Sequence, residues 1–122
     1  MLALILAAAL SQPPARLEIE PWTGKNLATT TGAAVKYRLG VTGKPNSTIR
    51  LHAGGVAKGW LAAFCTPLVC APMRVDVTLP QSGRAVYQFE LIREEDSGPK
   101  QSGARITGDD GSAVTVPPAV PR

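Results

Sequence analysis

Two cysteines, Cys65 and Cys70, are the residues of this chain whose types and spacing carry the clearest chemistry. They are its only cysteines, and the sequence between them is TPLV. An even number of cysteines in an exported chain favours a disulfide, and a turn that starts at Pro67 would bring the two Cα atoms within the range that a disulfide requires. Closing so short a loop contributes about 2 kcal/mol to stability in the chain-entropy model. The pair is therefore predicted to form a structural disulfide.

A redox dithiol and a metal site are the two other interpretations of the cysteine pair. A redox motif usually has two intervening residues at a helix N-terminus, and neither feature fits this sequence. A copper(I) site would combine the thiolates of Cys65 and Cys70 with the thioether of Met73, because all three are soft ligands. Met73 also lies in phase with the apolar residues Val75 and Val77, which favours core packing. We expect no cofactor and no metal, and the alternative function is that of a periplasmic Cu(I)-binding protein.

The side chains that catalysis requires are few and scattered. His52 is the only histidine, so any Ser-His-Asp or Cys-His mechanism must use it, and its alternating stretch places it on the solvent side with Arg50. The acidic residues 94–96 share one polar loop, whereas a glycosidase needs two carboxylates that face each other across a cleft. Asp109 and Asp110 could bind Ca²⁺, but Asp-Gly is also common turn chemistry, which we favour. The sequence therefore indicates a protein that is not an enzyme.

The charge of the chain is positive but dispersed. Thirteen Lys and Arg against nine Asp and Glu give a formal net charge of +4. Nucleic-acid binding needs clustered basic residues and often aromatic side chains for stacking, and this chain has no two adjacent basic residues and only 5% aromatic residues. We expect no nucleic-acid partner. The expected partner is an unidentified protein or a component of a cell surface.

An alternation of apolar and polar residues predicts the elements that position these side chains. Val75, Val77 and Leu79 alternate with polar residues, as in a half-buried strand, and the same period recurs between short stretches rich in Gly and Pro. Residues 80–83 are predicted to join two such strands as a hairpin. The fold class is therefore predicted to be all-β, an antiparallel sandwich of about seven strands. The predicted strands span residues 17–19, 35–41, 49–53, 73–79, 85–92, 104–107 and 113–116.

The inward phase of these strands predicts the hydrophobic core. Each core residue lies on the apolar phase of an alternating stretch, except Trp60, which is included for the large apolar surface that it would bury. The predicted core comprises Leu17, Ile19, Val35, Tyr37, Leu39, Val41, Ile49, Leu51, Trp60, Val75, Val77, Tyr87, Phe89, Leu91 and Ile106.

The first residues of the chain resemble an export signal. Residues 1–10 are all apolar, and as a helix they would reach only about 15 Å, half of a bilayer core, so no membrane span is expected. Their length suits a signal-peptide h-region, and a small-x-small pattern follows at residues 9–11, although no Lys or Arg precedes the run. The alternative is a buried N-terminal helix or strand. We predict a signal peptide over residues 1–11, one domain over 12–117, a Pro-rich tail over 118–122, and a secreted or periplasmic location.

Three segments carry a resemblance to a known family. Residues 49–60, IRLHAGGVAKGW, combine a strand with a Gly-Trp pair; a strand ending at residues 78–80 precedes Gly83 and a further strand; and residues 106–111 read ITGDDG. In these features the chain resembles the bacterial extracellular immunoglobulin-like modules called NEW3 or CARDB-like domains, which occur beside secreted hydrolases and surface proteins. The resemblance implies an immunoglobulin-like sandwich with an accessory or adhesive role and no catalytic residues to carry over. The cysteine pair is not a general feature of that family.

These observations together predict the function of the chain. It is expected to be an exported, non-catalytic β-sandwich module. Its expected role is structural, accessory or protein- or surface-binding. The chain lacks the inter-sheet cysteine pair of antibody domains. The resemblance supports the predicted fold but says little about the function.

Overall fold

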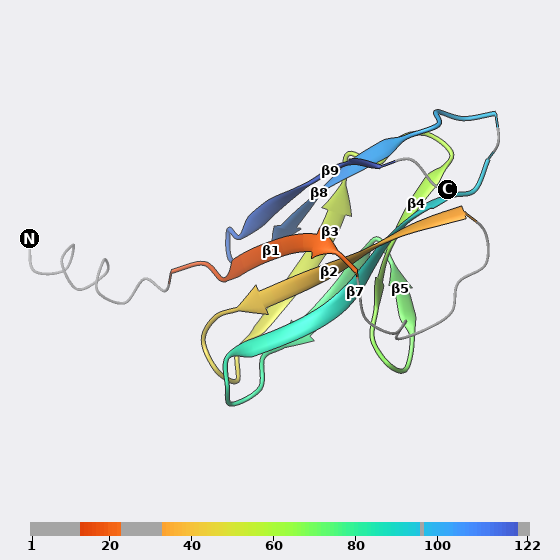
Figure 1. Cartoon of the computed structure of the whole chain (residues 1–122). Coiled ribbons are helices and arrows are strands. Elements are labelled where there is room, and N and C mark those ends of the chain that lie inside the picture. The colour runs from red at the N-terminus through yellow and green to blue at the C-terminus, as the bar shows by residue number, and fades with distance from the viewer. Residues whose placement is uncertain (1–12, 23–32, 96, 120–122) are drawn as a thin grey trace, which may run out of the picture.

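Strands account for all of the regular structure in the described part of the chain. The computed structural model describes residues 13–22, 33–95 and 97–119, which form nine strands and no helix. The strands form two antiparallel sheets, which confirms the predicted all-β class (Figure 1). The five-stranded sheet has the order β1 (Arg16–Pro21), β2 (Ala33–Thr42), β7 (Arg84–Arg93), β4 (Trp60–Cys65) and β5 (Cys70–Pro72). The four-stranded sheet has the order β6 (Arg74–Thr78), β3 (Thr48–Gly54), β8 (Ser102–Gly108) and β9 (Ala113–Ala119).

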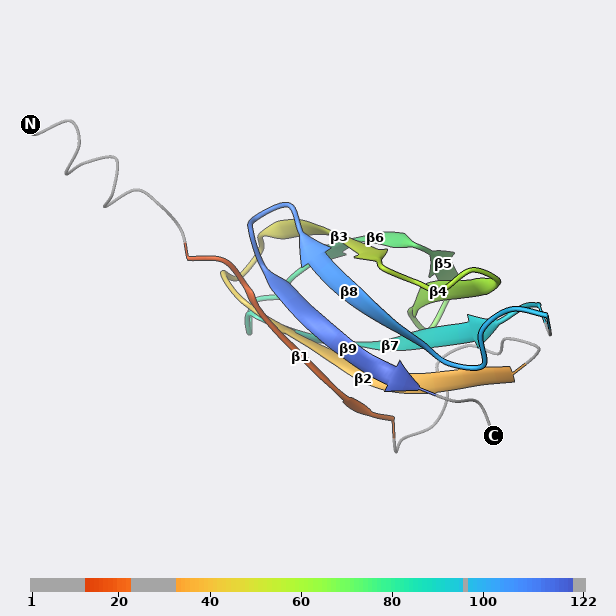
Figure 2. The same ribbon diagram turned by 90° about the horizontal axis from the view of Figure 1, so that it is seen from above.

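The hydrophobic core fills the space between the two sheets, which lie as two layers (Figure 2). Phe89 lies near its centre, and the centroid of its ring is 5.1 Å from that of Phe64 and 6.3 Å from that of Tyr37. Such tilted aromatic pairs stabilise a core beyond the area that they bury. Most of the predicted core residues are buried. The remaining four are half-buried and pack against the core: Ile19, Val35, Val75 and Tyr87.

Strands β4 and β5 are missing from the sequence-based prediction and raise the number of strands from about seven to nine. β4 is buried on both faces, so its sequence, WLAAFC, contains no alternation of apolar and polar residues. β5 has only three residues, too few to show any period. For the same reason Phe64, which is fully buried on β4, does not appear in the predicted core.

The connection between β6 and β7 is not the hairpin that the sequence predicts. β6 pairs with β3 whereas β7 pairs with β2 and β4, so the chain crosses from one sheet to the other. The connection packs on the β2–β3 turn, where the amide of Gly43 donates to the carbonyl of Gly83 at 2.8 Å. Gly83 has a φ of 74°, and a Cβ at this position would lie 2.5 Å from the Gly43 carbonyl oxygen. Only glycine fits there.

The chain changes sheets again at Met73, between β5 and β6. The amide of Met73 donates to the carbonyl of Ala62 on β4 at 2.9 Å, and its carbonyl accepts from the amide of Ala53 on β3 at 2.8 Å. Its φ of 65° is rare for a residue with a side chain and marks the bend at which a strand switches sheets. The side chain is half-buried and packs against the core, as its phase predicts. We call this residue the Met73 corner.

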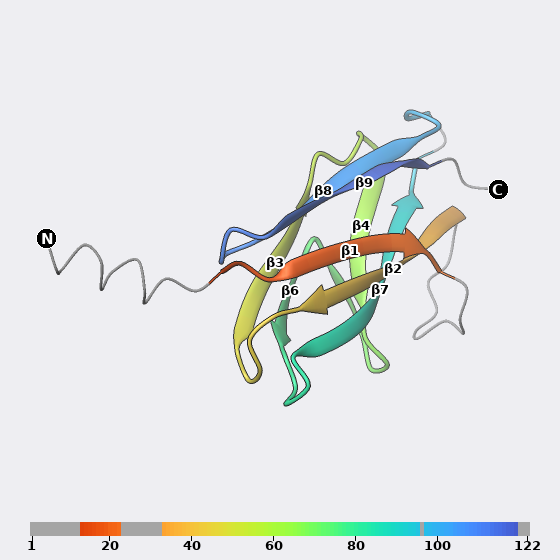
Figure 3. The same ribbon diagram turned by 60° about the vertical axis from the view of Figure 1, so that its left-hand side comes forward.

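Strands β1 and β9 lie side by side at neighbouring edges of the two sheets (Figure 3). The hydroxyl of Tyr37, on β2, donates to the carbonyl of Pro117 on β9 at 3.4 Å. β9 extends to Ala119, so it includes the first two residues of the segment predicted as a tail. Residues 120–122 and the signal peptide predicted over 1–11 lie outside the described residues. Within the described ranges, no helix is long and apolar enough to cross a membrane.

The substitution Phe89→Ala tests the position of the core. It should lower the free energy of unfolding by about 3–5 kcal/mol, because the truncated side chain leaves a cavity between the sheets. The matched control is Val86→Ala, because Val86 lies on the same strand and is 43% exposed. This control should change stability by less than about 1 kcal/mol. Urea denaturation followed by circular dichroism measures both variants, and equal losses would contradict the assigned core.

Candidate functional site

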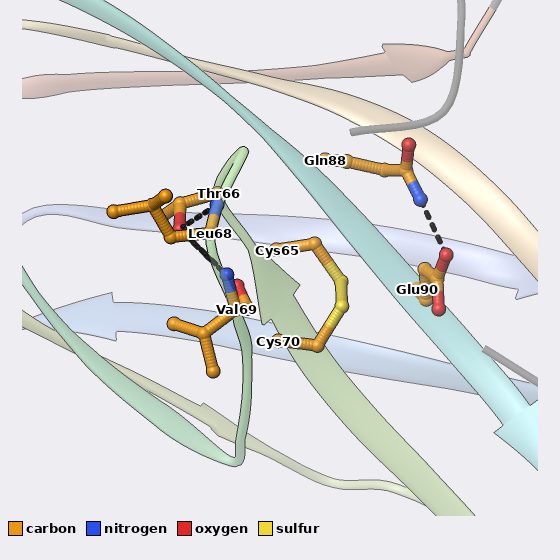
Figure 4. Close-up of a disulfide and its surroundings, with 7 residues drawn as sticks. All are labelled: Cys65, Thr66, Leu68, Val69, Cys70, Gln88 and Glu90. Carbon is orange, nitrogen blue, oxygen red and sulfur yellow. Dashed lines mark hydrogen bonds between the residues drawn. A yellow bond between two sulfur atoms is a disulfide. The ribbon is translucent and has the colours of Figure 1, made fainter. Parts of the chain in front are cut away.

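The predicted disulfide between Cys65 and Cys70 is present and closes the β4–β5 hairpin (Figure 4). The two residues face each other directly in the antiparallel register, with their Cα atoms 4.0 Å apart. Cys65 is fully buried and Cys70 is half-buried, so the bond joins the interior of the five-stranded sheet to its margin. The disulfide therefore anchors the loop that leaves the sheet here.

A tight turn forms the end of this hairpin, as Pro67 predicts. The amide of Thr66 donates to the carbonyl of Val69 at 2.8 Å. The hydroxyl oxygen of Thr66 accepts from the amides of Leu68 at 3.3 Å and Val69 at 3.2 Å. Side-chain hydrogen bonds of this kind satisfy backbone donors in a turn and hold its shape. The turn is thus constrained by a disulfide, a proline and the Thr66 side chain.

Residues 67–69, which we call the hairpin tip, expose apolar side chains to solvent. Leu68 is 95% exposed and Val69 is 59% exposed. The sequence contains no charged residue between Lys58 and Arg74, so the tip has no charge of its own and none nearby along the chain. Single exposed apolar residues are common. Among the described residues, the hairpin tip is where two large apolar side chains are exposed next to each other.

Behind the disulfide lie two buried polar side chains, Gln88 and Glu90, both 0% exposed. They come from β7, which pairs with β4 so that Gln88 faces Cys65. The amide nitrogen of Gln88 donates to a carboxylate oxygen of Glu90 (Figure 4). One carboxylate oxygen of Glu90 and the sulfurs of Cys65 and Cys70 all lie within 4.8 Å of one another. The structure thus brings a buried carboxylate to the cysteine pair.

Glu90 is a site residue that the sequence does not predict. In β7 the residues Gln88 and Glu90 occupy the polar phase of an alternating strand, which usually faces water. One signal does point to burial: Val86 and Ile92 lie at the two ends of this same phase, and both are apolar. A polar pair between apolar residues on one face indicates that the face is at least partly covered. Ile92 is in fact buried.

Met73 is not shown to join the cysteines. Its backbone forms the Met73 corner and its side chain packs against the core between the sheets. In this structure the sulfurs of Cys65 and Cys70 are bonded to each other. The alternative Cu(I) site formed by these three residues therefore stays a prediction.

His52 is exposed on β3, as its phase predicts. Its neighbours across the sheet are Arg74 on β6 and Thr107 on β8. On the same face, the side chain of Arg50 donates to a carboxylate oxygen of Asp76 at 3.0 Å, and this hydrogen bond raises the pKa of Arg50. The outer face of the four-stranded sheet is therefore a polar, solvated surface.

Asp110 and Asp109 lie in the turn between β8 and β9, as predicted. The carboxylate of Asp110 accepts hydrogen bonds from the amide of Ala15 at 2.8 Å and from both the amide and the hydroxyl of Ser112. Asp109 accepts from the amide of Arg50 at 3.0 Å. Partial burial alone would raise the pKa of Asp110, but the hydrogen bonds outweigh it and leave this pKa below its ordinary value. Both carboxylates thus have structural partners.

The other candidate groups offer less chemistry. Glu94 and Glu95 are exposed, and their amides donate to the carbonyl of Gly59 at 2.8 and 3.2 Å, while residue 96 lies outside the described part of the chain. A hollow on the outer face of the five-stranded sheet is lined by Arg16, Arg38 and Arg84. Arg16 and Arg38 are each paired with a glutamate at 2.8 Å, which offsets two of the three positive charges. The hairpin tip and the buried groups behind it therefore form the candidate site.

Comparison with known proteins gives no relative: the chain matches no protein-family model, no curated protein and no solved structure. A functional conclusion must therefore come from the geometry of its own residues.

Removing the disulfide should destabilise the protein moderately. The double variant Cys65→Ala, Cys70→Ala should lower the free energy of unfolding by about 2 kcal/mol, because the small loop is then unconstrained in the unfolded chain. Urea denaturation measures the change. A thiol reductant is the matched control: it should lower the stability of the original protein to that of the variant and leave the variant unaffected. No difference between the two oxidised proteins would contradict a stabilising role.

The substitution Asp110→Asn tests the hydrogen bonds of the β8–β9 turn. Because the folded-state pKa of Asp110 is lowered, its ionised form contributes stability above the unfolded-state pKa, and this stability is lost as the pH falls through the folded-state pKa. The variant should be less stable by about 1 kcal/mol at neutral pH, since the site is solvent-accessible. The difference should vanish in acid. Thermal unfolding from neutral to acidic pH measures it, with Glu94→Gln as the exposed control; a pH-independent difference would exclude this role.

Proposed function

We propose that the chain is an exported, non-catalytic immunoglobulin-like module that binds a protein partner through its hairpin tip. The single observation that carries this proposal is the 95% exposure of Leu68 at the end of a disulfide-closed turn. Burying a Leu or Val side chain contributes about 1.5–3 kcal/mol each. A turn that is already constrained loses little conformational entropy when it binds, so more of that contribution appears as affinity.

The order of the strands supports an immunoglobulin-like classification. In that fold one sheet has the strand order A-B-E-D and the other C-F-G. Here β1-β2-β7-β4 corresponds to the first order and β3-β8-β9 to the second. β5 and β6 are additions, at the far edge of one sheet and beside β3 in the other. The additional strand β5 is the one that creates the disulfide-closed hairpin.

The disulfide and the predicted signal peptide support export. Disulfides form and persist in oxidising compartments such as the periplasm and the extracellular space, and are rare in the cytosol. Cys65 and Cys70 are paired, and no free cysteine occurs in the described residues. A leader over residues 1–11 would deliver the chain to such a compartment.

The position of His52 supports a non-catalytic role. A nucleophilic mechanism needs a base held by hydrogen bonds next to the nucleophile. His52 is exposed on the outer face of the four-stranded sheet, and its neighbours across the sheet are Arg74 and Thr107. Binding a partner through an exposed surface does not require a histidine held in this way.

Site-specific photocrosslinking in the host that makes the protein tests this proposal. A photoreactive amino acid at position 68 should give one discrete protein adduct in the extracytoplasmic fraction, because the tip would be buried in the partner. The same amino acid at Gln81, another exposed turn residue, is the matched control and should give no such adduct. Val69→Asp should abolish the adduct, since a charge cannot enter an apolar pocket without a large desolvation cost.

Two results would overturn the proposal. The first is the same adduct from positions 68 and 81, or none from either. The second is a protein that stays in the cytoplasm with an intact N-terminus, whereas export predicts a mature chain beginning near Gln12.

A further inference from the structure

We propose that reduction of the Cys65–Cys70 disulfide creates a metal site in which the two thiolates and the carboxylate of Glu90 bind one zinc-like divalent cation. This inference is independent of the proposed function, which concerns the outer end of the same hairpin in its oxidised form. It rests on a position that the sequence pattern hides: Glu90 is fully buried against the cysteine pair.

The geometry of the three groups suits a single ion. The sulfurs of Cys65 and Cys70 and a carboxylate oxygen of Glu90 all lie within 4.8 Å of one another. In a tetrahedral zinc site, with Zn–S near 2.3 Å and Zn–O near 2.1 Å, the ligand atoms are separated by about 3.5–3.8 Å. Once the bond between the sulfurs is broken, small rotations of these side chains are enough to place all three around one cation. Three protein ligands leave the fourth position for water.

The supporting structure holds the ligands in place. Glu90 lies on β7 and Cys65 on β4, and these two strands pair along the middle of the five-stranded sheet. Gln88, also buried, donates a hydrogen bond to the carboxylate of Glu90 and thereby orients it. Ligands on paired strands with an outer hydrogen-bond partner give a more ordered site than ligands on loops. Only Cys70 lies at the half-buried margin, which gives an ion a way in.

The third ligand determines which metal is favoured. Two thiolates with a thioether would select Cu(I), because all three ligands are soft. Glu90 instead supplies a hard carboxylate, and zinc accepts sulfur and carboxylate oxygen together. Met73 forms the sheet-switching corner and its side chain packs on the core. The structure thus favours a divalent cation bound with Glu90 over a cuprous ion bound with Met73.

A dithiol supplies the electrons and protons that reduce the Cys65–Cys70 disulfide. Two thiols of the reductant transfer two electrons and two protons to the disulfide, which becomes two cysteine thiols while the reductant becomes a disulfide. Binding of the divalent cation then displaces both thiol protons to solvent. The total ligand charge of −3 is reduced to −1 by the ion, which lowers the cost of keeping these groups out of water.

Metal titration of the full, folded chain tests the proposal. The protein is reduced with a trialkylphosphine and titrated with Zn²⁺ against a chromophoric chelator, and with Co²⁺, whose thiolate charge-transfer band reports sulfur ligation. We expect one ion per reduced chain and none for the oxidised chain. Glu90→Gln should weaken binding by about tenfold or more, since even the outer partners of metal ligands contribute that much. Two control variants should bind Zn²⁺ as tightly as the original protein does: Glu94→Gln, which removes an exposed carboxylate, and Met73→Leu.

Each variant is first shown to unfold cooperatively in its oxidised form, so that a loss of binding is not a loss of fold. In the reduced protein, stoichiometric Zn²⁺ should raise the thermal midpoint, because the ion binds the folded state. Three results would overturn the proposal: no Zn²⁺ binding by the reduced chain, equal binding by Glu90→Gln, or a reduced chain without cooperative unfolding in Zn²⁺. Tight Cu(I) binding that depends on Met73 and not on Glu90 would establish the soft-ligand site in its place.

Discussion

Burial of residues 88–92 of strand β7 on both faces is the constraint on which the arrangement of the other strands depends. It turns Phe89 and Leu91 towards the opposite sheet and Gln88 and Glu90 to the other side, and all four side chains are fully buried. Along this stretch β2 pairs with one edge of β7 and β4 with the other, so its backbone groups are satisfied without water. Such a strand belongs in the middle of a sheet. Its place puts β1 and β5 at the margins, and β5 forms with β4 a hairpin whose tip exposes Leu68 and Val69.

The outer side of β7 carries two polar side chains, Gln88 and Glu90, that are fully buried. An amide and a carboxylate are costly to bury unless hydrogen bonds compensate, and Gln88 donates one such bond to Glu90. The disulfide covers part of the same strand and is itself apolar when oxidised. One hairpin therefore has two different ends, an uncharged turn in solvent and a sulfur pair beside a buried carboxylate. The environment of the sulfurs differs from that of an isolated surface disulfide because electrostatic interactions are strong in a buried region.

The sequence predicts half-buried strands well because apolar and polar residues alternate along them. Leu39 and Leu51 are buried where the alternation places them. β4 shows no such alternation because both of its faces are covered, which removes the polar phase by which a half-buried strand is recognised. The pairing of β6 is not predicted either, because a short connection indicates a turn without saying which strand edges are open. In the site, the spacing and Pro67 predict the disulfide, whereas Glu90 has the residue type of a solvent-facing position and is buried only by the tertiary fold.

The Met73 corner has a mechanical consequence for the hairpin that it follows. A three-residue edge strand such as β5 could be peeled from its sheet one hydrogen bond at a time by a pulling load. Here the load on the turn at Leu68 divides: the Cys65–Cys70 bond passes part of it to β4, and the backbone of Met73 passes the remainder to Ala62 in one sheet and Ala53 in the other. Tension at the exposed end is thereby shared by both layers, and the three-residue strand β5 does not bear it alone.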